Sequence, residues 1–424
     1  MKLRQFRAAG HWPTLLAACL YFNFSFMAWV TLGPLMVYIA TELTLPIEEQ
    51  FSLVAIPILT GALFRIPLGS LADHVGAKAT GLFAQTVVIA AIACAWIFGL
   101  PSKFSVELLG IVLGIAGASF AVALPQASRW YPPRYQGVVM GVAGLGNLGA
   151  VLATMTVPWS AEMFGCQNAF GFLLIPLSVT FVFYAVVAKD APGARRPVNL
   201  DSYLALIRDR DCWWFMFHYF IAFGGFVGLA NVLPLYFTLQ FHASGVAAGI
   251  MVGLTVSFGA VSRPVGGYIA DRVGGVRTLM GLFAVASLTY FAVAFVPAAP
   301  VPGISSGPAV GGSDFLDLSV GAWTAAALLT ICVLALGMAN GAIFQLLPQR
   351  FGREIGMMTG LVGCAGGLGG LFLAEALGLS KGLTDNFASG FIFPSALTAL
   401  GLLSLYLLKR RWRSTWGAMS QARV

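Results

Sequence analysis

Two arginines, Arg65 and Arg263, lie inside long apolar stretches, and each precedes an aspartate, Asp73 or Asp271, by eight residues. The two arginines are 198 positions apart, and their surroundings share a pattern, RIPLGSLADHVGAK at 65–78 and RPVGGYIADRVGGVR at 263–277. A guanidinium group is planar, keeps its charge, and can bind an oxyanion through two parallel hydrogen bonds. The pair therefore predicts a cationic site for a small anion.

The composition excludes a water-soluble protein. Of the 424 residues, 58% are hydrophobic and only 9% are charged, whereas soluble domains carry about 25% charged residues. A soluble enzyme and a nucleic-acid-binding protein are both excluded, despite the net charge of +8. The six cysteines form no CxxC pair, so we expect neither disulfides nor a metal cluster, and no cofactor.

The apolar residues are arranged as an all-α integral membrane protein with twelve transmembrane helices. A bilayer core of about 30 Å needs about 20 apolar residues per helix. The first stretch has no clear cleavage site and is expected to be a retained helix, not a signal peptide. The predicted spans are 14–40, 49–72, 79–99, 104–128, 137–160, 167–188, 213–239, 246–270, 278–297, 321–347, 356–378 and 388–408.

The basic residues predict the orientation. Of the 24 lysines and arginines, 20 lie in the termini and the connections on the same side, and only Lys103 and Lys381 lie on the other. Positive residues stay on the cytoplasmic side. We therefore expect a multi-pass protein of the cytoplasmic (inner) membrane with both termini in the cytoplasm.

The two remaining basic residues are Arg65 and Arg263, which lie about 12 Å inside the inner helix ends at 1.5 Å per residue. An unpaired arginine at mid-membrane costs at least about 2.5–3.5 kcal/mol. No carboxylate has a matching depth, since the deepest candidate, Glu375, lies near the outer end of its helix. The missing anion is therefore expected to be the substrate. The alternative is that the arginines bond to backbone carbonyls or extend toward water.

An internal repeat divides the chain into an N-terminal six-helix bundle (1–188), a cytoplasmic central loop (189–212) and a C-terminal six-helix bundle (213–424). Besides the repeat of 65–78 at 263–277, a second repeat relates GVVMGVAGLGNLG at 137–149 to GMMTGLVGCAGGLGG at 356–370. Two parallel, pseudo-symmetric halves with a charged central loop resemble the major facilitator superfamily. The G-x-L-A-D-x-x-G run also resembles that superfamily's signature.

Two further segments resemble the nitrate signatures of NarK-type nitrate/nitrite porters: AGLGNLGAVLATMTVP at 143–158 and GCAGGLGGLFL at 363–373. WYPPRYQG and FGGFVG are also similar to that family. The resemblance implies a secondary carrier of nitrate and/or nitrite that works by alternating access. Ala150 and the Cys364-Ala365 pair depart from the family pattern, so another small anion, such as formate or oxalate, stays open.

In that family, residues of the fourth, fifth and seventh helices contact the anion together with the two arginines, and aromatic rings sandwich it. The resemblance assigns this role to Phe120, Asn147, Tyr219 and Phe223. Asn23 joins this set only because of its depth and polarity. For each aromatic residue the alternative is ordinary packing.

The glycine-rich segment GLGNLG at 144–149 matches GxGxxG, but a dinucleotide site would need a βαβ unit. We instead expect close helix packing that forms a gate. The gating residues are expected to be Gly144, Gly146, Gly149, Gly363, Gly366 and Gly367. Asp73 and Asp271 are expected to latch the inward gate or to cap their helices.

The sequence leaves the coupling open between nitrate/nitrite exchange, which we favour, and proton-coupled symport. His218 is the only histidine inside a predicted span and could titrate near neutral pH. No catalytic cluster or Walker motif is present, so neither an enzyme nor a primary pump is expected. The expected partners are a small inorganic anion and the lipid bilayer, for a monomer without nucleic acid.

Overall fold

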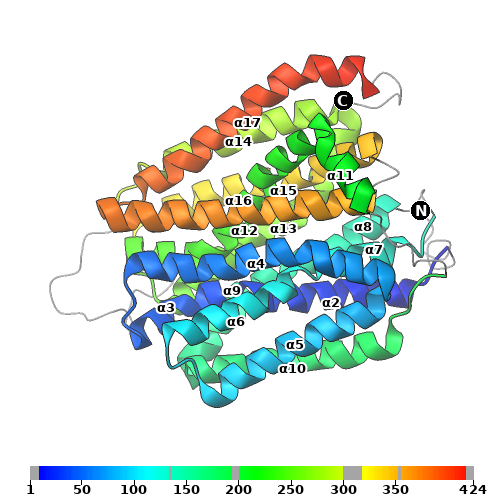
Figure 1. The fold of residues 1–424 in the computed structure, drawn as a ribbon. Helices are drawn as coiled ribbons and strands as arrows, with labels where there is room; N and C mark the ends of the chain where they lie inside the picture. The colour runs from blue at the N-terminus through cyan, green and yellow to red at the C-terminus, as the bar shows by residue number, and fades with distance from the viewer. Residues whose placement is uncertain (1–8, 133–135, 193–199, 299–317, 352–354, 417–424) are drawn as a thin grey trace.

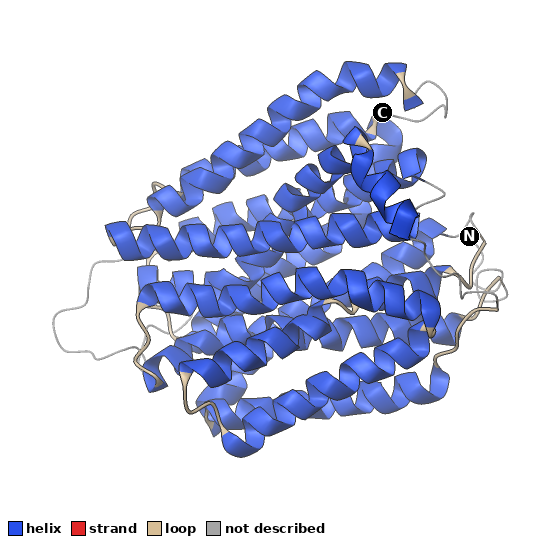
Figure 2. Cartoon of the chain, in the orientation of Figure 1, coloured by secondary structure: helices blue, strands red, loops and turns tan. Residues whose placement is uncertain are grey.

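The computed structural model describes residues 9–132, 136–192, 200–298, 318–351 and 355–416. These residues form helices and connecting segments, with no β-strand among them (Figure 2). Twelve of the helical segments are long and apolar enough to cross a membrane. The predicted all-α membrane protein with twelve spans is confirmed.

The helix bounds agree with the predicted spans to within a few residues. The first part of the chain contains α2 (Trp12–Val30), α3 (Leu32–Glu42), α4 (Ile47–His74), α5 (Ala77–Phe98), α6 (Lys103–Gly117), α7 (Phe120–Ser128), α8 (Gln136–Gly144), the 3₁₀ helix η2 (Leu145–Asn147), α9 (Leu148–Phe164) and α10 (Cys166–Val187). The second part contains α11 (Leu200–Arg208), α12 (Arg210–Phe241), α13 (Gly245–Val273), α14 (Gly275–Val293), α15 (Val320–Phe351), α16 (Ile355–Thr384) and α17 (Ala388–Ser414). The last two helices continue six residues beyond their predicted ends, since a helix need not stop where the hydrocarbon ends.

The helices gather in two groups (Figure 1). We call α2–α10 the N-terminal bundle and α12–α17 the C-terminal bundle. Within them, α4 packs on α6 and α13 on α15, while α4–α16, α9–α13 and α3–α12 form contacts between the bundles. This arrangement agrees with the predicted halves, whose boundaries and pseudo-symmetry stay a prediction.

The described parts of both chain ends lie at the same end of the molecule (Figure 1). We call this the inner end, following the orientation predicted from the basic residues, and the opposite end the outer end. Helix α11 corrects the prediction of a loop at 189–212. Leu200, Leu204 and Ile207 recur at helical spacing along it, which favours a short amphipathic helix.

Two of the spans are interrupted where the candidate site lies. The fourth span breaks between α6 and α7, and the amide of Ala121 bonds the carbonyl of Ala118 at 2.9 Å. The carbonyl of Gly117 is thereby left without its usual partner, the amide four residues later. The fifth span contains η2, which ends at Asn147. Both breaks occur in glycine-rich segments, where the helix is least stable.

A polar cluster holds the inner ends of three helices of the C-terminal bundle together. Asp211 of α12 is buried, with 3% of its surface exposed. Its carboxylate accepts from Arg350 Nε at 3.0 Å, Arg411 Nη2 at 2.9 Å and Trp412 Nε1 at 2.9 Å. A carboxylate with three donors retains most of the hydrogen bonding that it loses from water.

We expect Asp211→Ala to lower the unfolding temperature in detergent, because it leaves a buried indole N–H and two guanidinium groups short of an acceptor. The loss should be about 1–3 kcal/mol. Asp385→Ala is the matched control, since Asp385 pairs with Lys381 on the surface with 91% of its side chain exposed. Equal unfolding temperatures for the two variants would contradict the role given to Asp211.

Candidate anion-binding site

The structure brings the two predicted arginines to one aromatic ring. The Cζ atom of Arg65 lies 5.5 Å from the ring centre of Phe120, and that of Arg263 lies 6.0 Å from the same centre. The two charges are therefore less than about 12 Å apart, one from each bundle. The faces of aromatic rings attract cations, so Phe120 lessens the cost of bringing the two charges together.

Arg65 is almost fully buried, with 1% exposed. Its Nε and Nη2 donate to the carbonyl of Gly117 at 3.4 and 3.5 Å, and its Nη1 donates to the carbonyl of Gly363. The break after α6 makes the first of these carbonyls available. The alternative considered from the sequence, that an arginine bonds to backbone carbonyls, holds for Arg65.

Arg263 is held differently. It is half-buried, and its Nη1 is buried without a hydrogen-bond partner among the described residues. Its Cζ lies 4.8 Å from the ring centre of Phe344 of α15. No ion pair between described residues includes Arg65 or Arg263. A buried donor without an acceptor is costly, and a bound anion would remove that cost.

Two aromatic side chains of α12 line the same region. Tyr219 and Phe223 stack at 5.1 Å with 5° between their planes, and Phe223 lies 5.1 Å from Arg65 Cζ. The ring of Tyr219 packs edge-on against Phe344 at 5.4 Å. The Tyr219 hydroxyl lies near both arginines and is directed to Arg263, but the two groups form no hydrogen bond of normal geometry. It is a second buried donor that an anion could satisfy.

The two predicted asparagines have different positions. Asn147 is 2% exposed at the end of η2, which packs on α13, the helix of Arg263, and its Oδ1 has no partner among the described residues. Asn23 donates from Nδ2 to the carbonyl of Leu145 at 3.5 Å, so its amide is directed at the backbone of η2. A direct contact of Asn23 with the anion stays a prediction.

Trp29 and Phe344 also line the site, although neither is predicted from the sequence. The Trp29 indole donates to the Pro57 carbonyl at 2.6 Å, and its ring lies 5.5 Å from Arg65 Cζ. A further repeat points to the segment of Phe344 but not to the residue itself. GIAGASFAVALPQ at 114–126 and GMANGAIFQLLPQ at 337–349 share their first glycine and their final Leu-Pro-Gln, and this alignment places Ile343, the residue before Phe344, at the position of Phe120. Nothing in the sequence distinguishes Trp29 from the nine other tryptophans.

The predicted gating glycines differ in their surroundings. A Cβ atom on Gly149 would lie 1.9 Å from the backbone oxygen of Asn23, and one on Gly146 would overlap the ring of Phe22. On α16, a Cβ on Gly363 would meet Arg65, on Gly366 the rings of Tyr219 and Phe223, and on Gly367 Ala62. Gly144 corrects the prediction of close packing, because a Cβ there would have nothing within 4 Å.

The remaining predicted residues lie away from the arginines. Asp73 pairs with Arg129 of the same bundle, so in this conformation it does not latch the two bundles together. Asp271 lies at the inner end of α13. The Nε2 of His218 lies 2.9 Å from Ser404 Oγ, and the ring packs on Trp214 and Phe283.

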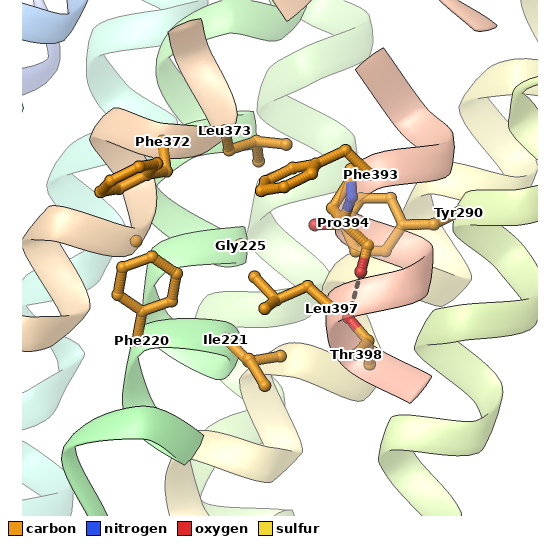
Figure 3. Close-up of a pocket in the computed structure, with 11 residues that line it drawn as sticks. Phe220, Ile221, Gly225, Tyr290, Phe372, Leu373, Phe393, Pro394, Leu397 and Thr398 are labelled. Carbon is orange, nitrogen blue, oxygen red and sulfur yellow. Dashed lines mark hydrogen bonds between the residues drawn. The ribbon is translucent and has the colours of Figure 1, made fainter. Parts of the chain in front are cut away.

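A separate apolar pocket lies between α12, α14, α16 and α17 (Figure 3). Its lining includes Phe220, Leu373 and Leu397. The Thr398 hydroxyl in its wall donates to the carbonyl of Pro394 at 2.6 Å. Neither arginine lines this pocket, and an anion would find no charged group in its lining.

The chain is similar to known membrane transporters over most of its length. The sequence profile of the Major Facilitator Superfamily matches residues 18–374. A "Nitrite extrusion protein" of Bacillus subtilis (strain 168) is 30% identical over 384 residues, 90% of each chain. A "Probable nitrate/nitrite transporter NarK2" of Mycobacterium tuberculosis (strain ATCC 25618 / H37Rv) is 33% identical over 369 residues, 85% of this chain and 87% of the relative.

A "Probable nitrate transporter NarT" of Staphylococcus carnosus (strain TM300) is 30% identical over 394 residues, 92% of this chain and 94% of the relative. Among solved structures, a bacterial homolog of the human lysosomal transporter Spinster, inward-facing and occupied, matches with a TM-score of 0.65 at 15% identity. The match covers 93% of this chain and 96% of that one, and it shows the fold.

We expect Arg65→Lys and Arg263→Lys each to abolish nitrate transport while the protein still inserts in the membrane. An ammonium group cannot form the paired bonds of a guanidinium. Loss of one charge-assisted bond should weaken nitrate binding by about 10- to 100-fold. Arg272→Lys is the matched control, since Arg272 is exposed at the inner end of α13. Near-normal transport and affinity in either variant would exclude a two-arginine site.

We expect Gly366→Val to weaken nitrate binding, because its side chain would displace Tyr219 and Phe223. Gly144→Val should bind nitrate normally, since this conformation has room for the side chain, but should turn over more slowly if the segment closes as a gate. Gly281→Val of α14, which also has nothing within 4 Å of an added Cβ, is the control. Undiminished turnover of Gly144→Val would refute its gating role.

Proposed function

Because the chain belongs to the major facilitator superfamily, and within it to the nitrate/nitrite porter family, we propose that it carries nitrate and nitrite across the cytoplasmic membrane by alternating access. It is a transporter and not an enzyme. The observation that carries the choice of substrate is the pair Arg65 and Arg263 around Phe120, with no carboxylate paired to either in the described part of the chain.

The unused donors fit a small planar anion. Arg263 Nη1 and the Tyr219 hydroxyl are buried and without acceptors, and the rings of Phe120 and Phe344 stand over the Arg263 guanidinium. Nitrate and nitrite have oxygens in a plane and a single negative charge, which such donors between ring faces can hold. Formate shares these properties, so competition among anions decides between them.

Exchange is the coupling that the charges favour. Two positive charges less than about 12 Å apart repel by roughly 1–2 kcal/mol at an effective dielectric constant of 20, and each also loses hydration as the cavity closes. A bound anion offsets part of both costs. An empty carrier should therefore change conformation slowly, and a loaded carrier quickly.

Proton symport is the second candidate, and the position of His218 argues against it. The ring is buried, lies next to Ser404 and aromatic residues of α14 and α17, and has no described contact with either arginine. Among the described residues, the side-chain partner of the ring is Ser404, and no hydrogen bond joins the ring to a side chain of the candidate site. His218 is better explained as part of the packing of the C-terminal bundle.

We expect proteoliposomes loaded with nitrite to take up labelled nitrate much faster than empty ones, because the return of the empty carrier is slow. An imposed pH gradient should have little effect, and His218→Ala should retain exchange. Competition by nitrite, formate and chloride measures the anion preference. Fast uptake into empty vesicles that is driven by protons and lost in His218→Ala would exclude exchange.

A further inference from the structure

The two bundles meet along α4 and α16, whose contacts form a regular antiparallel series. From the outer end inward, an added Cβ on Gly378 would meet Phe51, and one on Gly370 would meet Ile58. We call this series the α4–α16 seam. Its members are the pairs Glu48/Gly382, Phe51/Gly378, Ser52/Glu375, Ile58/Gly370, Ala62/Gly367 and Arg65/Gly363.

The seam ends at Arg65. One turn further inward on α16, a Cβ on Gly360 would have nothing within 4 Å, and one on Gly69 of α4 would meet only Ala121 of its own bundle. Other glycines that approach the opposite bundle closely also lie on the outer side, for example Gly33 with Asn231 and Gly249 with Thr154. The close contact between α4 and α16 therefore extends from the outer end as far as the arginine, and is absent at the two glycines one turn further inward.

Only two hydrogen bonds join the bundles among the described residues. Ser52 Oγ donates to Glu375 Oε2 at 3.2 Å near the outer end, and Arg65 Nη1 donates to the Gly363 carbonyl at the innermost point of the seam. Each bond has one ionised partner, but the second is buried while the first is only partly buried, so the second is the stronger of the two. Opening the outer end requires both to break.

The donors of Arg65 limit what else it can bind. Its Nε and Nη2 are directed at Gly117 of its own bundle, and its Nη1 at Gly363 of the other bundle. A planar anion bound by two parallel N–H groups on the Nη1–Nη2 edge would need the position of the Gly363 oxygen. Arg263 Nη1 has no such competitor among the described residues.

We propose that the Gly363 carbonyl is an internal substitute for the anion, so that Arg65 couples anion binding to opening of the outer end, while Arg263 is the group that first holds the anion. When the anion takes the Nη1 bond of Arg65, the seam loses its innermost bond and the outer halves of α4 and α16 can separate. This inference rests on the proposed function for the identity of the anion, and it gives that function a reason for exchange. Without an anion, Arg65 Nη1 again donates its hydrogen bond to the Gly363 carbonyl.

The test uses a cysteine reporter within the seam. Ile58→Cys is introduced in full-length protein whose six native cysteines have been replaced and whose transport has been verified. Ile58 is 0% exposed, so the reporter should react slowly with a membrane-impermeant maleimide in lipid nanodiscs. Asp385→Cys, at an exposed outer position, gives the reference rate.

With Arg65 present, nitrate should speed labelling at position 58 relative to position 385. Arg65→Met should label fast with or without nitrate. Its labelling rate without nitrate should exceed that of the protein with Arg65 by about tenfold or more, which is the effect of losing one charge-assisted hydrogen bond. Arg65→Lys keeps a donor for the Gly363 carbonyl but not the paired bonds, so it should label slowly and respond little to nitrate. Met and Lys have side chains of similar size, so a difference in labelling between these two variants reports the loss of the hydrogen bond and not a change in side-chain volume.

Arg263→Met is the matched control, since it removes the other charge and leaves the seam bond intact. It should label slowly at position 58 and should not respond to nitrate. Slow labelling of Arg65→Met, or equal labelling of the Met variants of both arginines, would overturn the proposal. If Arg65→Met does not fold, fast labelling of Arg65→Lys without nitrate would overturn it equally well.

Equilibrium binding of nitrate to the same samples separates this inference from the proposed function. If nitrate does not bind the parent protein but Arg65→Met still labels fast, the substrate assignment is wrong and the role of the Gly363 carbonyl is supported. If nitrate binds and is transported while Arg65→Met labels slowly, the function holds and the carbonyl is no substitute.

Ser52→Ala should raise labelling less than Arg65→Met, because the bond that it removes is more exposed.

Discussion

The rest of the structure depends on two permanent positive charges near the middle of the membrane, which have no paired carboxylate in the described part of the chain. A buried guanidinium must find acceptors or aromatic faces. The fold supplies both: the carbonyls of Gly117 and Gly363 for Arg65, and the rings of Phe120 and Phe344 for Arg263. The groups that still lack partners among the described residues, Arg263 Nη1 and the Tyr219 hydroxyl, are those to which an anion can bond.

The helix interruptions follow from the same constraint. A regular helix uses all its internal carbonyls, so a carbonyl that serves a side chain from another helix is most readily provided by a break. The fourth span breaks just after Gly117, and Arg65 bonds to that residue. Glycines also let α4 and α16 approach closely, which brings Gly363 of one bundle to the arginine of the other.

The two arginines look equivalent in the sequence but are unequal in the structure. They lie at the same depth in repeated segments, and from the sequence both are expected to play the same part in one anion site. In the structure, Arg65 bonds to backbone carbonyls of both bundles, while Arg263 Nη1 has no hydrogen-bond partner among the residues that the structure describes. An internal repeat determines which residue types recur, but the contact between the halves involves different surfaces of each, and so the copies acquire different partners.

The sequence by itself determined the twelve spans and the depth of the arginines, because the cost of placing a residue in hydrocarbon depends on its type and its position along one axis. Amphipathic α11 was missed because a nine-residue helix among polar residues leaves little trace in a search for apolar segments. Only the tertiary structure decided which residues of equal depth face each other. The amide of Asn23 bonds to Leu145 and the ring of His218 contacts Ser404. A side chain at Gly144 would enter open space, whereas the ring of Phe120 lies near both arginines. The depth of a residue can be read from its position along the chain, but the contacts of its side chain depend on which helices pack beside it, and only the tertiary structure determines that.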